Sequence, residues 1–213
     1  MSPKDVSPDQ GASNEYRVVL TGGPSAGKTA ILELARKTFG KQVYVLEEAA
    51  GITYRGGFPR RSTVRSRASA QRVIFRIQCE LEEIAAEAAP GALHLCDRGT
   101  LDGIAYWPGT PNEFLAAFHT SESAEHARYA AVVHLRTPQA GNGYEKVGVR
   151  IESAEEAHKI DEELLRIWQN HPRRFVVEST SDFMEKASAV LAILRNELAR
   201  HHELARDTTS RAP

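Results

Sequence analysis

Residues 17–35, RVVLTGGPSAGKTAILELA, decide the fold of this chain. The stretch begins with a short apolar run that is typical of a buried strand, and it ends with apolar residues at helical spacing. Between these two parts, residues 22–29 fit the Walker A pattern G-x-x-x-x-G-K-[ST]. Glycines allow backbone conformations that a side chain forbids, so successive N–H groups can converge on one anion at the start of the helix. The stretch therefore predicts a strand, a phosphate-binding loop and a helix.

The residues of this loop have expected roles in binding a nucleoside triphosphate. The Lys28 ammonium would reach the β- and γ-phosphates, and the Thr29 hydroxyl would bind Mg²⁺. The alternative is an ordinary glycine-rich turn with a solvated lysine, which the complete pattern between a strand and a helix disfavours. We therefore expect the nucleotide to contact Gly22, Gly23, Pro24, Ser25, Ala26, Gly27, Lys28, Thr29 and Ala30.

The composition indicates a single domain with a substantial core, because 41% of the 213 residues are hydrophobic. The formal net charge of −1 argues against general adhesion to nucleic acid or membrane. Cys79 and Cys96 have no metal-ligand or redox spacing, which indicates core residues in a reducing compartment. The first fifteen residues are polar, and no apolar run approaches membrane-spanning length. We expect a cytoplasmic protein without a transmembrane segment or a nucleic-acid partner.

Strand and helix patterns alternate along the chain. Strands are expected at residues 17–21, 42–46, 92–96, 130–136 and 174–178. Helices are expected after the glycine-rich loop, at residues 69–89, after the capping box of Thr110, Pro111 and Glu113, at residues 153–170 and from Asp182 onward. This alternation predicts an α/β fold of three layers, with a parallel five-stranded sheet and helices on both faces. Residues 16–204 would form the domain, and residues 1–15 and 205–213 would be disordered.

Charged residues follow the second and third expected strands. Glu47 and Glu48 end the second strand, and Asp97 and Arg98 end the third, with Asp102 shortly after. In a parallel sheet the ligand lies beyond the carboxyl ends of the strands. A carboxylate there can bind Mg²⁺ or serve as a general base, and an arginine can neutralise phosphoryl oxygens. The alternative is that these residues cap helices or pair with each other, and which carboxylate is the base stays open.

Several stretches together resemble a known group of P-loop proteins. The stretches are LTGGPSAGKTAILE at 20–33, EEAAGITYRGGFPR at 47–60, QRVIFRIQCELE at 71–82, CDRGTLDGIAYWPG at 96–109 and VRIESAEEAHKIDEELLRIWQNHPRRFVVE at 149–178. They look like the NadR-type or AAA-like ATPase domains, which are similar to ribosylnicotinamide kinase domains and to the GTP-binding TRPL-translocation-defect proteins. More distantly, residues 97–99, DRG, resemble the Asp/Glu-Arg motif of deoxyribonucleoside and thymidylate kinases. The resemblance covers about residues 17–198 and implies a nucleoside- or nucleotide-kinase-like P-loop NTPase fold.

The resemblance also implies roles for individual residues. Lys28 and Thr29 would lie at the triphosphate and Mg²⁺, Asp97 at Mg²⁺, and Arg98 at the transferring phosphoryl group. Glu48 would match the carboxylate that accepts the proton of the acceptor hydroxyl. The nucleoside kinases usually have proline before that carboxylate, whereas this chain has Glu47. Residues 137–152 would form a lid whose Arg150 closes over the phosphates, the alternative being an ordinary surface loop.

The segment between the second and third strands is unusually basic. Residues 49–79 contain no Asp or Glu, which favours an anionic partner; their arginines are Arg55, Arg60, Arg61, Arg65, Arg67, Arg72 and Arg76. The alternative is a solvated helical face, so Arg55, Arg60 and Arg61, beside the sequence GGFP, are the better ligand candidates. A helical wheel places the core stripe of residues 69–89 at Ile74, Ile77, Leu81, Ile84 and Ala88. Beside it, Gln71, Phe75 and Gln78 would either border the cleft and bind a planar ring or simply pack.

Two functional classes remain compatible with these patterns. The first is a Mg²⁺-dependent phosphotransferase that uses ATP or GTP to phosphorylate a hydroxyl of a nucleoside-like or sugar-like acceptor, for which the basic segment would suit an anionic group. The second is a nucleotide-dependent switch or adaptor that binds a polyanion such as a phosphoinositide. The guanine motif N-K-x-D is absent, which weakens the switch hypothesis. The acceptor, the preferred nucleotide and the oligomeric state stay open.

Overall fold

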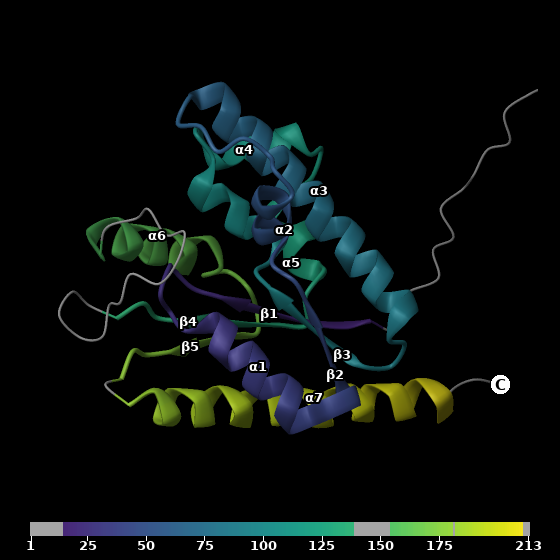
Figure 1. Cartoon of the computed structure of the whole chain (residues 1–213). Coiled ribbons are helices and arrows are strands. Elements are labelled where there is room, and N and C mark those ends of the chain that lie inside the picture. The colour runs from purple at the N-terminus through teal and green to yellow at the C-terminus, as the bar shows by residue number, and fades with distance from the viewer. Residues whose placement is uncertain (1–14, 139–153, 181, 211–213) are drawn as a thin grey trace, which may run out of the picture.

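Five parallel strands form one sheet at the centre of the structure (Figure 1). The computed structural model describes residues 15–138, 154–180 and 182–210, without the side chains of 208–210. The strands are β1 (Tyr16–Thr21), β2 (Val43–Leu46), β3 (Leu93–Asp97), β4 (Ala131–Leu135) and β5 (Arg174–Val177), in the spatial order β2-β3-β1-β4-β5. All four strand pairings are parallel, with Val19 of β1 beside Cys96 on one side and Val132 on the other. The expected five-stranded parallel sheet is confirmed.

Helices cover both faces of this sheet. On one face, α1 (Lys28–Phe39) and α7 (Phe183–Ser210) pack on Val18 and Leu20 of β1. On the other face, α3 (Val64–Ala88) and the end of α6 (Ala154–Ile167) pack on Val19. Val18, Val19 and Leu20 have no exposed surface, because β1 is central and alternate side chains enter the two cores. Figure 1 shows the resulting three layers, with α1 and α7 below the sheet and α3 above it.

The remaining elements are short and connect the larger ones. They are η1 (Gly40–Gln42), α2 (Ala49–Arg55), η2 (Thr100–Tyr106), α4 (Pro111–Ala117) and α5 (Glu122–Ala127). The expected capping box at the start of α4 is confirmed, since the Thr110 hydroxyl accepts from the Glu113 N–H and the Glu113 carboxylate accepts from the Thr110 N–H. The elements α2 and η2 were not expected, and both of them border the site described below. Within the described residues, no helix is long and apolar enough to cross a membrane.

Helix α3 differs from the sequence expectation in both start and orientation. It begins at Val64, because the Thr63 hydroxyl accepts from the Ser66 N–H and caps it. The predicted core stripe is wrong at its C-terminal end, since Ile84 is 57% exposed and Ala88 is also exposed. The buried stripe consists instead of Ala70, Gln71, Phe75, Gln78, Glu82 and Ala85. Three of these residues are polar, and two of them, Gln78 and Glu82, hydrogen-bond to each other, which a wheel based on apolarity does not detect.

The ends of the chain also differ from expectation. The disordered tail expected at 205–213 is wrong for residues 205–210, because α7 runs to Ser210. No glycine or proline interrupts α7, and Glu203, Leu204 and Ala205 favour helix. Residues 1–14, 139–153 and 211–213 lie outside the described residues, and they include residues 139–152 of the expected lid.

Candidate functional site

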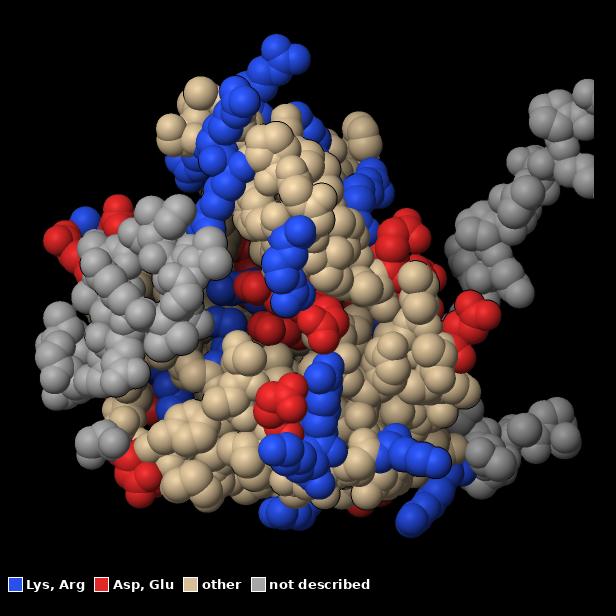
Figure 2. Space-filling view, in the orientation of Figure 1, with Lys and Arg blue, Asp and Glu red and all other residues tan. Residues whose placement is uncertain are grey.

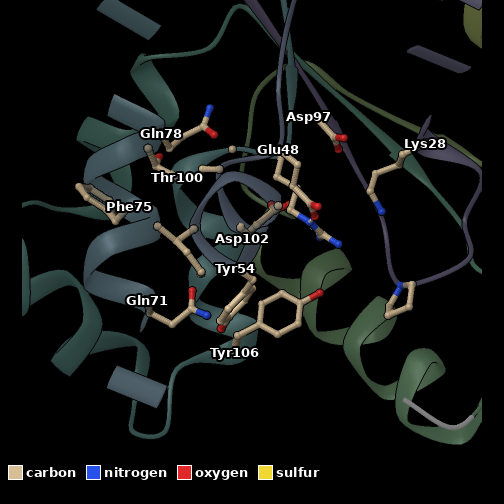
Figure 3. Close-up of a pocket in the computed structure, with 18 of the residues that line it drawn as sticks. Lys28, Glu48, Tyr54, Gln71, Phe75, Gln78, Asp97, Thr100, Asp102 and Tyr106 are labelled. Atoms are coloured by element: carbon tan, nitrogen blue, oxygen red, sulfur yellow. Dashed lines mark hydrogen bonds and ion pairs between the residues drawn. The ribbon is translucent and has the colours of Figure 1, made fainter. Parts of the chain in front are cut away.

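A cavity of about 590 Å³ lies at the carboxyl ends of β1, β2 and β3. Its walls come from the glycine-rich loop, the start of α2, the helix α3 and the turns of η2. Acidic and basic side chains meet in this hollow on the face shown in Figure 2. In Figure 3, Lys28 and Asp97 lie on one side of the cavity, and Gln71, Phe75 and Gln78 lie on the other. The location is the one that parallel α/β sheets use for ligands.

The glycine-rich loop curls around the ammonium group of Lys28. Lys28 Nζ donates to Gly22 O at 2.7 Å and to Gly23 O at 3.1 Å. Burial lowers the Lys28 pKa to about 8. Gly22 has a φ of 137°, and a Cβ there would lie 2.1 Å from Leu135 O, so no other residue fits. Gly27, with a φ of 90°, turns the chain directly into α1. The sequence thus produces the loop that the pattern predicts.

The expected nucleotide contacts of the loop divide into two groups. Pro24, Ser25, Ala26, Gly27, Lys28 and Thr29 line the cavity. Gly22, Gly23 and Ala30 are not among its lining residues. The N–H of Gly23 donates to Asp161 Oδ1 at 3.0 Å, so it supports the loop rather than facing a ligand. Nucleotide contact by the cavity-lining residues stays a prediction.

Asp97, at the end of β3, presents a buried carboxylate beside the loop. Burial raises the Asp97 pKa to about 6, although the charge of Lys28 acts in the opposite direction. Asp97 Oδ1 has no hydrogen-bond partner among the described residues. A buried oxygen without a partner, in the cavity that Thr29 also lines, has the hard-ligand chemistry that Mg²⁺ takes. Among the described residues, no group of three or more His, Cys, Asp or Glu is placed so that it could hold a metal ion by itself. The donor set therefore fits Mg²⁺ held mainly by phosphate and water.

Arg98 crosses the middle of the cavity. Its Nε donates to Glu48 Oε1 at 2.9 Å, and its terminal nitrogen lies 3.5 Å from Asp102 Oδ2. The guanidinium also lies over the Tyr106 ring, 5.6 Å from its centroid. Arg98 has a φ of 81°, a strained conformation that non-glycine residues rarely adopt. The strain is compensated by contacts with Glu48, at the start of α2, and with Asp102 and Tyr106 of η2, which hold the guanidinium in the cavity.

The two glutamates after β2 have different positions. Glu48 lines the cavity and pairs with Arg98. Glu47 is exposed and is not a lining residue; it pairs at the surface with Arg36 at 3.6 Å and Arg55 at 3.4 Å. The sequence leaves Glu47, Glu48 and Asp97 open as the general base. Only Glu48 and Asp97 among these three line the cavity.

The far wing of the cavity is lined by aromatic and amide side chains. Gln71, Phe75 and Gln78 project from α3, opposite Tyr54 of α2 and Tyr106 of η2. Phe75 is 6% exposed and stacks on Phe118 with ring centroids 3.8 Å apart. These side chains border the cavity and Phe75 also packs in the core, while the binding of a planar ring stays a prediction. This wing can accommodate a planar ring next to the glycine-rich loop.

The basic segment contributes two residues to the cavity. Arg55 and Arg60 are lining residues, and the Arg60 guanidinium lies over the Tyr54 ring at 5.1 Å. Arg61 is exposed and does not line the cavity. Arg67 donates to Tyr106 O at 3.1 Å, which ties the start of α3 to η2. Arg150, the expected lid arginine, lies outside the described residues.

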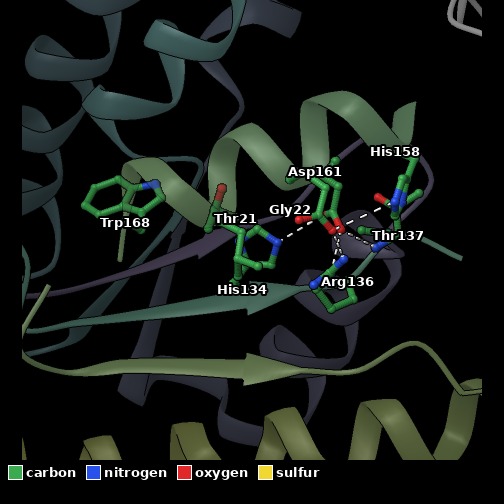
Figure 4. A network of polar contacts seen from close by, with 12 residues as sticks. Thr21, Gly22, His134, Arg136, Thr137, His158, Asp161 and Trp168 are labelled. Atoms are coloured by element: carbon green, nitrogen blue, oxygen red, sulfur yellow. Dashed lines mark hydrogen bonds and ion pairs between the residues drawn. The ribbon is translucent and has the colours of Figure 1, made fainter. Parts of the chain in front are cut away.

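A buried carboxylate on α6, which the sequence analysis missed, supports the glycine-rich loop (Figure 4). Asp161 has no exposed surface and accepts from Gly23 N, His134 Nε2, Arg136 Nε and Thr137 N at 2.8–3.2 Å. These donors lower its pKa to about 2, although burial is the largest influence and acts in the opposite direction. Asp161 lies in line with three fully buried residues, Ala157, Leu164 and Trp168. A lone carboxylate in an apolar helix stripe was the signal in the sequence.

Thr137 and Lys186 complete this support. Thr137 Oγ1 donates to Pro24 O at 3.2 Å, so the first residue of the expected lid braces the loop. Lys186 Nζ, on α7, donates to Ala26 O at 3.0 Å and to Arg136 O at 2.7 Å. The loop is therefore fixed from α6, β4 and α7, and its conformation is preorganised for a ligand.

Comparisons with known proteins agree with this geometry. The family described as an AAA domain matches residues 17–186. A solved structure of deoxyadenosine kinase from M. mycoides with bound dATP superposes with a TM-score of 0.57 at 12% sequence identity, covering 84% of this chain and 99% of that chain. No curated protein sequence matches the chain. The P-loop, nucleoside-kinase-like fold expected from the sequence is confirmed, and the identity of 12% shows the fold alone.

Proposed function

The chain belongs to this AAA-domain family of P-loop proteins, and on that premise we propose that it is a Mg²⁺-dependent phosphotransferase. It would use ATP or GTP to phosphorylate a hydroxyl of a nucleoside-like or sugar-like acceptor. One observation carries the proposal: a single cavity joins the glycine-rich loop to the wing of Gln71, Phe75 and Tyr106. A nucleotide switch needs only the first part of this cavity, whereas a kinase needs room for an acceptor beside the γ-phosphate.

The residues of the cavity divide the proposed chemistry between them. Lys28 binds the β- and γ-phosphates, while Thr29 and Asp97 hold Mg²⁺, which neutralises phosphate charge when it is bound. Arg98 stabilises the charge on the γ-phosphoryl oxygens in the transition state. The acceptor oxygen forms a bond to the γ-phosphorus, and the bond from that phosphorus to the leaving nucleoside diphosphate breaks. The acceptor proton passes to Glu48, whose position the Arg98 contact at 2.9 Å fixes.

The alternative proposal is a nucleotide-dependent adaptor for a polyanion. It rests on Arg55, Arg60 and Arg61, whose side chains are exposed in the basic segment. The same arginines suit the phosphotransferase, because Arg55 and Arg60 line the cavity and can bind an anionic group of the acceptor. The two proposals differ in their need for a general base.

A pair of neighbouring variants tests that need. Glu48→Gln preserves the size of the side chain and removes its charge, so turnover of the best acceptor should fall ~10²- to 10⁴-fold with nucleotide affinity nearly unchanged. Glu47→Gln is the matched control, because the same substitution falls on the adjacent exposed residue outside the cavity. Steady-state kinetics with purine, pyrimidine and pyridine nucleosides would measure both. Equal turnover of the two variants would refute the role of Glu48.

A further inference from the structure

Glu82 is a buried carboxylate that touches the cavity only through another residue. It lies on α3 and has no exposed surface. Its Oε1 accepts from Tyr129 OH at 2.7 Å and from Gln78 Nε2 at 2.9 Å, and its Oε2 pairs with Arg128. Arg17 Nε lies 3.9 Å from the same Oε2. Glu82 is thus surrounded by donors from different elements.

These contacts determine which end of the Gln78 amide faces the cavity. A carboxylate paired with arginine only accepts hydrogen bonds, so Gln78 must turn its NH₂ group toward Glu82. Its carbonyl oxygen is then directed away from Glu82, and Gln78 is a lining residue of the cavity (Figure 3). A flipped amide would place two acceptor oxygens against each other in a buried site, which is costly. The chain therefore presents an acceptor, not a donor, from this position.

The anchors of Glu82 make this orientation rigid. Tyr129 OH, which donates to Glu82, accepts in turn from Thr100 N at 2.9 Å, and Thr100 belongs to η2, which packs against α3. Gln78 itself is 3% exposed and has little room to rotate. Phe75, one helical turn before Gln78, lines the same cavity with an aromatic side chain. The carbonyl oxygen and the ring together suit one edge and one face of a flat ligand.

We propose that Glu82, by orienting Gln78, selects acceptors whose planar ring carries an exocyclic NH₂ donor at the position that faces the Gln78 oxygen. Glu82 is a positioning residue in this scheme, since only Gln78 touches the ligand. The inference deepens the proposed function and rests on it, because the ligand beside Gln78 is an acceptor only if the protein is a phosphotransferase. Rings that present a carbonyl oxygen at the same edge would face the Gln78 oxygen and be disfavoured.

Matched nucleosides that differ by an amino or a keto group provide the test. Adenosine and inosine form one pair, and cytidine and uridine form the other. For each pair, kcat/KM for phosphate transfer and Kd by calorimetry are measured with the wild-type protein. The amino member should be favoured by ~10-fold or more in at least one pair, because the keto member places an oxygen where the amino member places its NH₂ and so sets an acceptor against the Gln78 acceptor. Equal use of both members in both pairs, or binding of neither, overturns the inference.

Glu82→Gln changes the orienting group without changing its size. The new amide can donate to the Gln78 oxygen and let Gln78 turn its NH₂ into the cavity, so the amino preference should vanish or reverse. Glu125→Gln is the matched control: Glu125 is 5% exposed and accepts from Thr100 Oγ1 at 2.6 Å, but it makes no contact with Gln78. Glu125→Gln should keep the amino preference. The inference is contradicted if both variants keep the amino preference or if both lose it.

A second variant covers the case in which Glu82→Gln does not fold. Gln78→Met removes the carbonyl oxygen at similar volume, and it should abolish discrimination within each pair while leaving Glu82 with Arg128 and Tyr129. Unchanged discrimination in Gln78→Met overturns the inference. Failure of the proposed function gives a different result, in which calorimetry shows the amino preference but no nucleoside is phosphorylated. Failure of the inference alone gives phosphate transfer without discrimination.

Discussion

Asp161→Asn should destabilise the domain by about 3 kcal/mol and weaken nucleotide binding. The side chain accepts from four donors in a site without exposed surface, and one of those donors is the N–H of Gly23 in the phosphate-binding loop. Asparagine keeps one acceptor oxygen and places an NH₂ group against the remaining donors. The substitution therefore removes a charge and leaves buried N–H groups without acceptors, at almost constant volume.

The size of this effect follows from the Asp161 pKa. The pKa of about 2 in the folded protein, against an ordinary ~3.9, corresponds to about 2.6 kcal/mol of stability. The sign is that of a depressed carboxyl pKa: the contribution is complete above pH ~4 and disappears as the pH falls toward 2. The difference between wild type and variant should therefore be largest near neutral pH and should shrink below pH 4.

Urea unfolding at pH 7 and pH 3, together with nucleotide titration at pH 7, measures this prediction. Glu162→Gln is the matched control, because Glu162 also pairs with Arg136 but is 42% exposed, and exposed ion pairs contribute ~1 kcal/mol or less. The support role would be refuted if the free energy of unfolding of Asp161→Asn at pH 7 were within ~1 kcal/mol of the wild-type value and its nucleotide affinity were unchanged. A destabilisation that persists undiminished at pH 3 would show that the charge is not its source.

Two further predictions concern the cavity. Lys28→Ala should remove most of the ATP and GTP affinity, because the substitution removes a phosphate contact. The variant loses the hydrogen bonds of Lys28 to Gly22 O and Gly23 O, but it should stay folded because the loop keeps its anchors on α6 and α7. Titration calorimetry of the folded variant checks this, and wild-type affinity would contradict it. Mg²⁺-dependent nucleotide binding should weaken as the pH falls through about 6, because protonation of Asp97 removes a metal ligand. Asp97→Asn should lose both the Mg²⁺ dependence and this pH dependence, and an unchanged profile in Asp97→Asn would assign the titration to another group.

The fold could be predicted from the sequence because its signals are local. The glycine-rich pattern at residues 22–29 and the regular alternation of apolar strands and helices need no information about distant contacts. The same holds for the capping box of Thr110 and Glu113, whose partners lie three residues apart. The site could be predicted in part, because residues that directly follow the strands of a parallel sheet lie at one edge. Glu48, Asp97 and Arg98 were identified in this way, and they line one cavity.

The parts that sequence reasoning missed depend on polar groups buried by distant partners. Glu82 occupies the core-facing stripe of α3 because Tyr129 and Arg128, more than forty residues away, donate hydrogen bonds to it, and Gln78 does so because it donates to Glu82. A helical wheel identifies the buried face by its apolar residues, so it assigns the wrong buried face to such a helix. Asp161 is similar, because its burial is favourable only with donors from β4 and the glycine-rich loop. In both cases a carboxylate within an apolar stripe marks a buried network.

The most direct test of the account is a transfer assay with the wild-type protein. ATP or GTP labelled at the γ-phosphate is incubated with Mg²⁺ and each nucleoside of the panel, and labelled acceptor and labelled inorganic phosphate are quantified separately. A phosphotransferase with an acceptor wing beside its P-loop should place label on at least one acceptor faster than on water. Hydrolysis alone with every acceptor, or GTP binding without either product, would contradict the phosphotransferase and favour the nucleotide-dependent adaptor.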